Sequence, residues 1–253
     1  MNKKLIYQFS STKTEGDKSM LDLLGGKGAN LAEMSILGIN VPPGFTVTTE
    51  VCNYFIENKS FPDKFDSELE KALADLEKIT KKKFNDDTTP LLLSVRSGGK
   101  VSMPGMMDSI LNIGINDKNV DALASNFNDE RFALDSYRRL IQMYGNVVLE
   151  IDMDRFEAII DNKKRIDGVE KENDFDSEQL SWIIDAFKTT VERFAGNPFP
   201  QDPVIQLKGA IEAVFKSWLN KRAVTYRKIN NIPNNWGTGT VSYTHLRAHE
   251  TKA

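Results

Sequence analysis

The feature that most limits the possible folds is a long block, residues 117–200, in which apolar side chains recur at helical spacing. Two segments show this clearly, 131–151 ("RFALDSYRRLIQMYGNVVLEI") and 176–196 ("DSEQLSWIIDAFKTTVERFAG"). A repeat of three to four residues puts an apolar stripe on one side of a helix. The expected stripes are Tyr137, Ile141, Tyr144, Val148 and Ile151, then Leu180, Ile183, Phe187, Val191 and Phe194. Because the block shows almost no strand pattern, we predict an all-helical subdomain at 117–203.

The chain before this block mixes strand and helix patterns. Short apolar runs at 4–9 and 91–95 predict strands. The segment "VPPGFTVTTE" predicts a turn, a strand and the start of a helix capped by Thr49. An amphipathic helix is expected at 64–81.

A further helix is expected after the block, where Asp202 can cap and Pro203 suits the first turn. Its apolar face is Leu207, Ile211, Val214, Phe215 and Trp218. The fold class is therefore α+β. We expect one unit from residues 1–116 together with return helices at 204–238, with the helical subdomain inserted into it.

Charge and cysteine content exclude several classes of protein. A net charge of -3 gives no overall attraction to nucleic acid or to an anionic membrane surface. The single cysteine, Cys52, cannot form an intrachain disulfide. The apolar run at the start is too short for a signal-peptide core or a membrane span. We expect a cytoplasmic protein that binds neither nucleic acid nor membranes.

A glycine-rich stretch, "LLGGKGANLAEM" (23–34), leads into a predicted helix at 29–37 that ends at Gly38. Glycines let backbone N–H groups approach an anion, and a helix N-terminus favours negative charge. Lys27 adds a positive charge suited to a phosphate. The stretch lacks the Gly-x4-Gly-Lys-Ser/Thr pattern, so by itself it fits a plain turn better than a phosphate cradle.

The second candidate stretch is "SVRSGGKVSMPGMMDSILN" (94–112). Arg96 follows the predicted strand at 91–95, where ligands often bind, and a guanidinium can hold two phosphate oxygens. Gly98, Gly99 and Gly105 make the following loop pliable. Taken alone, the residues fit slightly better an arginine in a salt bridge and methionines packed in a core.

Together the two stretches resemble the pyruvate, phosphate dikinase family, whose N-terminal part has "GGKG" before a helix and "SMPGMMD" after an arginine. Other matching segments are "GFTVTTE", "RFALDSYRRLIQMYG" and "AVTYRKINNIPNNWGT". The resemblance extends from about residue 4 to Thr238. The pyruvate, water dikinase family shares GGK and VRS but continues with a segment rich in acidic residues, so "SMPGMMD" favours the phosphate-using family.

This resemblance implies a partial ATP-grasp nucleotide-binding fold with an inserted helical subdomain. By the matching motifs, Lys27 and Arg96 are expected to hold the phosphates of ATP, and the loop from Gly98 to Gly105 to close over them. Gly99 and Lys100 stand where the family usually has Ala and Arg, which leaves the detail of that loop open.

Arg139 matches an arginine that we assign to docking of a phosphate-carrier domain. The alternative for Arg139 is an ion pair on a helix surface, which contributes little.

The resemblance also implies a reaction, in which ATP, phosphate and pyruvate become AMP, pyrophosphate and phosphoenolpyruvate with Mg²⁺ as cofactor. A histidine on a middle domain transfers the phosphoryl group, so the parent enzyme is a phosphotransferase with paired acceptors, and a homodimer when complete. Both histidines of this chain, His245 and His249, lie near its end, and the family's magnesium ligands match later positions. We expect ATP as ligand, no catalytic residue, no metal ligand, and no complete reaction from this chain alone.

The chain departs from the family pattern after Thr238. The ending "VSYTHLRAHETKA" resembles translated adaptor sequence, so we expect 239–253 to be a non-native tail whose removal does not lower the melting temperature. A metal pair formed by His245 and His249 is the weaker alternative, since no third ligand lies nearby.

Two other functions stay open. One is a stand-alone, non-catalytic nucleotide-binding or docking module. The other is a fragment of a pyruvate, water dikinase.

Overall fold

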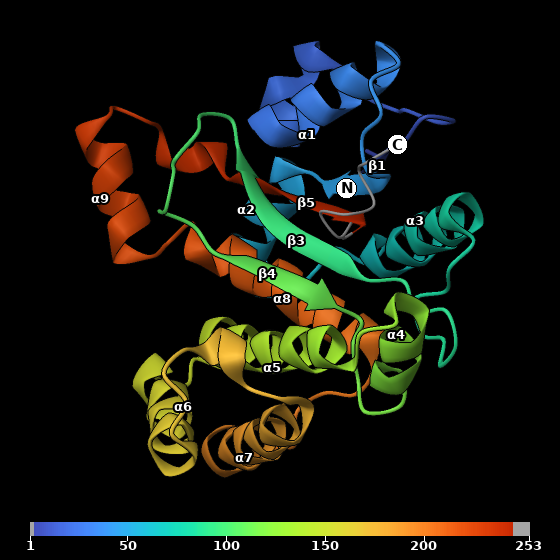
Figure 1. Cartoon of the computed structure of the whole chain (residues 1–253). Coiled ribbons are helices and arrows are strands. Elements are labelled where there is room, and N and C mark those ends of the chain that lie inside the picture. Colours follow the sequence, from blue (N-terminus) through green and yellow to red (C-terminus); the bar gives the residue numbers. More distant parts are fainter. Residues whose placement is uncertain (1–2, 245–253) are drawn as a thin grey trace. The chain divides into compact units, whose positions relative to one another are not determined.

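A computed structural model of the chain describes residues 3–244. These residues form an α+β structure with nine α-helices and a five-stranded sheet of order β1-β2-β5-β3-β4 (Figure 1). The chain divides into two compact units. The first unit contains the residues up to Lys82, Leu93–Ser109 and the residues from Ile211 onward, and the second contains Lys83–Leu92 and Ile110–Ala210.

The sheet joins strands from both ends of the chain. Early in the sequence, β1 (Ile6–Phe9) and β2 (Gly44–Val47) form an antiparallel pair, and β3 (Leu93–Gly99) and β4 (Ser109–Ile113) follow. The last strand, β5 (Thr238–Thr244), pairs antiparallel with β2 on one side and β3 on the other. Figure 1 shows this strand, in red, beside the green β3.

Strand β5 includes the first residues of the segment 239–253, which we expected to be a non-native tail. Residues 239–244 are in β5, and all of them except Tyr243 are buried. A strand between two others satisfies backbone N–H and C=O groups on both sides, which explains why this segment is included whatever its side chains. The rest of the expected tail, with His245 and His249, lies outside the described residues.

The first unit packs helix α1 (Leu21–Ile36) on the sheet. Ala32 and Leu31 of this helix meet Phe9 and Val241 in one apolar cluster. The predicted helix at 29–37 is therefore confirmed as the second part of α1. Its first turns end at Gly25, which has φ 67° and ψ 169°, and the helix resumes after it.

A second cluster of the first unit is aromatic. The helices involved are α2 (Thr49–Asn58), α3 (Phe65–Thr80) and the end of α8 (Pro203–Ser217). The Phe55 ring lies 5.0 Å from Phe61 and 6.0 Å from Phe215, and Phe61 stacks on Phe65 at 4.1 Å. Rings at such separations attract one another beyond simple area burial.

The cap of α2 differs by one residue from the prediction. Thr48, not Thr49, has extended backbone, and its Oγ1 accepts a hydrogen bond from the N–H of Val51. Thr49 instead donates its hydroxyl to the carbonyl oxygen of Asp22, 2.6 Å away. Two adjacent threonines offer the same local chemistry, so the tertiary contact decided between them.

Residues 117–200 of the second unit are helical, as their apolar spacing predicts, and no strand occurs between those residues. The second unit also contains most of β4. Its helices are α4 (Val120–Phe127), α5 (Glu130–Val147), α6 (Met153–Asp167) and α7 (Ser177–Ala195). Asp176 caps α7 in a capping box with Gln179, and Gly196 ends it in a left-handed conformation.

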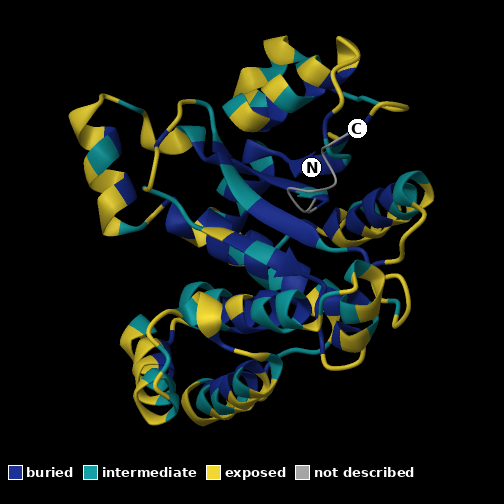
Figure 2. Cartoon of the chain, viewed as in Figure 1, coloured by how far each residue is buried: buried dark blue, intermediate teal, exposed yellow. Residues whose placement is uncertain are grey.

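The core of the second unit lies between α5, α6 and α7, which lie together in Figure 1. Tyr137, Ile141 and Tyr144 of the first predicted stripe are buried, and the Phe156 ring of α6 lies 4.9 Å from Phe187 of α7. Figure 2 shows these helices dark blue on their packed sides and yellow on their outer sides.

One member of the predicted stripes, Phe194, is not in the core, because it is 43% exposed. The guanidinium groups of Arg155 and Arg193 lie 3.8 and 5.4 Å from its ring centre. Near the end of α7 the ring is thus covered by cations rather than by apolar side chains.

Among residues 3–244, no helix combines the length and apolar character needed to cross a membrane.

Candidate functional site

The two glycine-rich stretches meet in the first unit, where α1 begins beside the end of β3. A Cβ atom added to Gly25 would lie 1.6 Å from the carbonyl oxygen of Gly98. Gly25 also has a positive φ, so both its conformation and its surroundings require glycine. The backbones of Gly25 and Gly98 therefore touch, although the two residues lie 73 positions apart in the sequence (98 − 25 = 73).

The helix that resumes after Gly25 places Lys27 in its first turn. The Nζ of Lys27 donates a hydrogen bond to the carbonyl oxygen of Ser97, 3.0 Å away. Partial burial of the ammonium lowers the pKa of Lys27, and the positive charge of Arg96 lowers it further. The N-terminal end of a helix and a nearby lysine both favour an anion.

Arg96 lies within β3, opposite Val241 of β5, rather than at the strand end. Its guanidinium lies 5.7 Å from the ring centre of Tyr243, and its Nε is buried without a hydrogen-bond partner among the residues that the structure describes. Within residues 3–244, neither Lys27 nor Arg96 forms an ion pair with an acidic side chain. Two neighbouring cations that are partly removed from water and have no carboxylate partner lower the stability of the fold.

A cavity of about 660 Å³ opens beside Lys27, a size typical of small-molecule sites. Arg96 does not line it. The lining residues are Leu21, Gly26, Lys27, Asn30, Leu31 and Met34, then every residue from Ser97 to Gly105, Met107 and Ser109.

The cavity offers no magnesium ligands. None of the residues that line it is acidic, and no cluster of three His, Cys, Asp or Glu side chains occurs in the part of the chain described. Since Mg²⁺ binds through carboxylate oxygens, these residues do not fit a resident magnesium ion.

The predicted pliable loop is shorter than expected. Gly98 and Gly99 are held in β3, opposite Gly239 and Thr238, so the loop proper begins at Lys100. Only Gly105 of the three predicted glycines stands free in the loop, with φ 71° and no neighbour within 4 Å of an added Cβ. Backbone pairing with β5, which no local pattern reveals, explains the difference.

The start of the loop is held by Lys100. Its ammonium forms an ion pair with Asp22 of α1 and lies 4.5 Å from the ring centre of Trp236. The Lys100 ammonium therefore has two partners in this chain.

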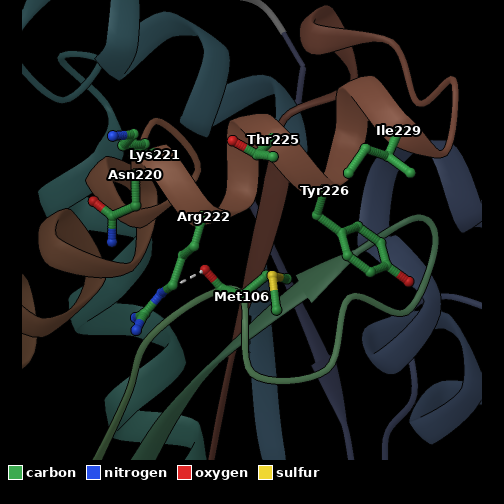
Figure 3. A pocket seen from close by; sticks show the side chains of 7 residues that line it. All are labelled: Met106, Asn220, Lys221, Arg222, Thr225, Tyr226 and Ile229. Carbon is green, nitrogen blue, oxygen red and sulfur yellow. Dashed lines mark hydrogen bonds between the residues drawn. The ribbon is translucent and has the colours of Figure 1, made fainter.

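The end of the loop is held by α9 (Lys221–Ile229). Figure 3 shows Arg222 pointing to the loop, where its Nε donates to the carbonyl oxygen of Met106 at 3.1 Å. Arg222 also forms an ion pair with Asp108, and the amide of Asn220 donates to the same carboxylate at 3.1 Å. The same face of α9 borders a shallow, mainly apolar hollow with Tyr226 and Ile229.

Arg139 lies on α5 in the second unit and is not among the residues of the Lys27 cavity. Its Nε is 2.8 Å from Asp135, an ion pair of the kind named as its alternative. The neighbouring Arg138 is the buried one, with partners on Asp135, Gln142 and Glu172.

Sequence reasoning missed Asn30, which lines the cavity one helical turn after Lys27. The spacing of three residues could have indicated it, since residues i and i+3 share a helix face.

This arrangement can be compared with known proteins. The family described as "Pyruvate phosphate dikinase, AMP/ATP-binding domain" matches residues 21–83 and 58–242. The chain belongs to this family. The family match includes Lys27, Arg96 and most of β5.

Curated relatives agree with this membership. The pyruvate, phosphate dikinase of Rickettsia conorii is 52% identical over 237 residues, which are 93% of this chain and 27% of that protein. Those of Rhizobium meliloti and Clostridium symbiosum are each 48% identical, covering 93% of this chain and 26% and 27% of their own length. The chain spans about a quarter of the length of the pyruvate, phosphate dikinases that it matches.

Proposed function

We propose that the cavity beside Lys27 binds the phosphates of ATP, as part of the nucleotide-binding region of a pyruvate, phosphate dikinase. The observation that most supports this is that two nearby cations, Lys27 and Arg96, have no carboxylate partner in residues 3–244. A bound polyphosphate would supply the missing negative charge. Lys27 would act as a point charge in the cavity. Arg96, which lies outside the cavity lining, would act as a planar donor to phosphate oxygens that extend beyond it.

The backbone around the cavity supports the same ligand. Gly26 and the residues after it present N–H groups at the beginning of a helix, and Gly98 and Gly99 leave room beside them. An added Cβ at Gly26 would lie 3.3 Å from the carbonyl oxygen of Lys100, so even alanine would crowd this approach. Such an arrangement suits an anion that must come close to the main chain.

The wider activity is part of the proposal, because the relatives are much longer than this chain. ATP, phosphate and pyruvate would become AMP, pyrophosphate and phosphoenolpyruvate, in an ATP-grasp enzyme that is a cytoplasmic homodimer. The phosphoryl group would pass to a histidine of a carrier domain, with Arg139 in its docking. Mg²⁺ would arrive with the nucleotide and not through residues of the Lys27 cavity.

The test is ATP binding by this chain, measured by isothermal titration calorimetry at fixed salt and magnesium concentrations. Lys27→Ala and Arg96→Ala should each weaken binding by about tenfold or more, since a hydrogen bond to a charged group contributes about 1.5–3 kcal/mol. Lys18→Ala is the matched control, because Lys18 is an exposed lysine paired with Glu33 outside the cavity. Equal ATP affinity in all four proteins would reject the site.

A further inference from the structure

The loop between β3 and β4 has an exposed tip with one buried side chain. Of residues 100–105, Met103 is the buried one, at 6% exposure, whereas Val101, Ser102, Pro104 and Gly105 are exposed. A methionine adapts its shape to an irregular gap and interacts well with aromatic rings. Among residues 101–105, Met103 is therefore the side chain that attaches the tip to the fold, and the partly buried Met106 and Met107 pack against the same cluster at the end of the loop.

Met103 enters a socket made by Trp218 and Ala223, which are 1% and 0% exposed. The socket is rigid, since Trp218 has three fixed contacts. The guanidinium of Arg227 stacks 3.9 Å from its ring centre, and the same arginine donates to the carbonyl oxygen of Trp218 at 2.6 Å. The indole N–H donates to the carbonyl oxygen of Asn234 at 2.9 Å.

The two ends of the loop are held independently of Met103. Lys100 is paired with Asp22 at the start, and Asp108 with Arg222 and Asn220 at the end. Polar contacts thus fix where the loop leaves and rejoins the fold, but they do not fix the position of residues 101–105 between those two points.

The position of the tip matters because its residues line the Lys27 cavity. Ser102, Met103, Pro104 and Gly105 all border that space. The carbonyl oxygen of Met103 accepts a hydrogen bond from the N–H of Met106 at 3.2 Å, and this closes a turn around Gly105. Where Met103 sits therefore decides which main-chain groups of the tip face the cavity.

We propose that Met103 is a positioning residue that holds the tip of the loop over the phosphate site by inserting into the Trp218–Ala223 socket. This inference rests on the proposed function of the Lys27 cavity. It assigns to the methionine an indirect role, through the backbone of the loop, and no contact of its own with the nucleotide.

The test compares Met103→Ala with Met103→Leu, which nearly conserves the side-chain volume. Leu219→Ala is the matched control, because Leu219 is an exposed apolar residue beside Trp218 and lines no part of the cavity. Binding of ATP and of inorganic tripolyphosphate is measured by calorimetry. Met103→Ala should weaken both ligands by a similar factor, tenfold or more, while the other two variants stay within about twofold of the original chain.

A second measurement needs no ligand. Trypsin should cut after Lys100 faster when the tip is released from the fold. The rate is measured by mass spectrometry of the fragment that ends at Lys100. Met103→Ala should be cut several times faster than the original chain, and Met103→Leu and Leu219→Ala at the original rate. If Met103→Ala does not fold, Met103→Val is the milder variant and should show smaller changes of the same kind.

Each outcome decides between the two proposals. If the unmodified chain does not bind ATP, the phosphate site is rejected, and with it any role of Met103 in binding. Unchanged affinity in Met103→Ala, or an effect on ATP without one on tripolyphosphate, would reject the positioning role alone. Unchanged cleavage at Lys100 would show that Met103 does not hold the tip.

Discussion

At the scale of single residues, the most demanding position in the first unit is Gly25. Its backbone has φ 67° and ψ 169°, a region essentially restricted to glycine, and its missing side chain lets the carbonyl oxygen of Gly98 approach. Gly38 also has a positive φ, 75°, but a Cβ added to it would have no neighbour within 4 Å among the described residues. The two glycines therefore share a positive φ and differ in the close approach of another backbone.

We predict that Gly25→Ala destabilises the chain more than Gly38→Ala. A residue with a side chain at positive φ costs about 1 kcal/mol, or ~2–4 °C in melting temperature for a protein of this size. Gly38→Ala should show that loss, and Gly25→Ala at least twice as much. Thermal unfolding followed by circular dichroism measures both. Equal losses would mean that the contact with Gly98 is relieved without cost.

A second prediction at this scale concerns the charge of Lys27. Its pKa is lowered by burial and by Arg96, so the charged form opposes folding at every pH below that lowered value. Lys27→Met should therefore raise the melting temperature of the ligand-free chain at pH 7 by a few degrees at most. The gain should shrink as the pH rises through the lowered pKa, where the lysine of the original chain becomes neutral.

Lys27→Arg is the control, since it keeps the charge and should give no gain. Added ATP should stabilise the original chain more than Lys27→Met at the same concentration, because the stabilisation by a ligand falls as its dissociation constant rises. A lower melting temperature for Lys27→Met across the whole pH range would show that the charge of Lys27 does not oppose folding.

At the scale of elements, β5 combines a central position with polar side chains. Thr240, Ser242 and Thr244 are buried, yet their hydroxyl oxygens have no hydrogen-bond partner within residues 3–244. The backbone of β5 is well paired while its side chains are not. Strand pairing therefore outweighs the loss of hydrogen bonds by these hydroxyl groups.

We predict that Thr240→Val stabilises the chain. Valine has nearly the same shape and removes a buried hydroxyl without a partner, which should contribute about 1 kcal/mol. Thr48→Val is the matched control of opposite sign, because the equally buried Thr48 caps α2 and its loss should cost about 1 kcal/mol. Urea unfolding of the three proteins gives both differences. A destabilised Thr240→Val would indicate a partner for that hydroxyl.

At the scale of the whole molecule, β5 is the element on which the first unit depends. It pairs with β2 through residues 44–47 and with β3 through residues 93–99. We predict that a chain ended after Thr238 loses cooperative thermal unfolding, because both neighbours then have unpaired edges. A chain ended after Thr244, which keeps all of β5, is the control. Unchanged melting after removal of residues 239–244 would restore the view that they form a tail.

The helices and the composition of the site could be predicted from the sequence because their causes are local. The apolar spacing predicted the helices within residues 117–200, and Gly196 predicted the end of α7. The two glycine-rich stretches predicted most of the residues that line the Lys27 cavity. The exceptions have physical reasons. Phe194 is covered by arginines, Thr48 caps in place of Thr49, and Gly98 is held in a strand. In each case a contact distant in sequence decided between choices that are locally equivalent.

The sequence by itself determined which segments become helices and where glycine is needed, and its family resemblance led to the prediction that Lys27 and Arg96 serve one site. Only the tertiary structure decided that residues 239–244 complete the sheet, that the Lys27 and Arg96 cations lie without a carboxylate, and that Met103 is buried under Trp218. Helices form from interactions within a few residues, which the sequence displays directly. Strand pairing, burial and charge proximity join residues far apart in the chain, and their energies depend on neighbours that no local pattern specifies.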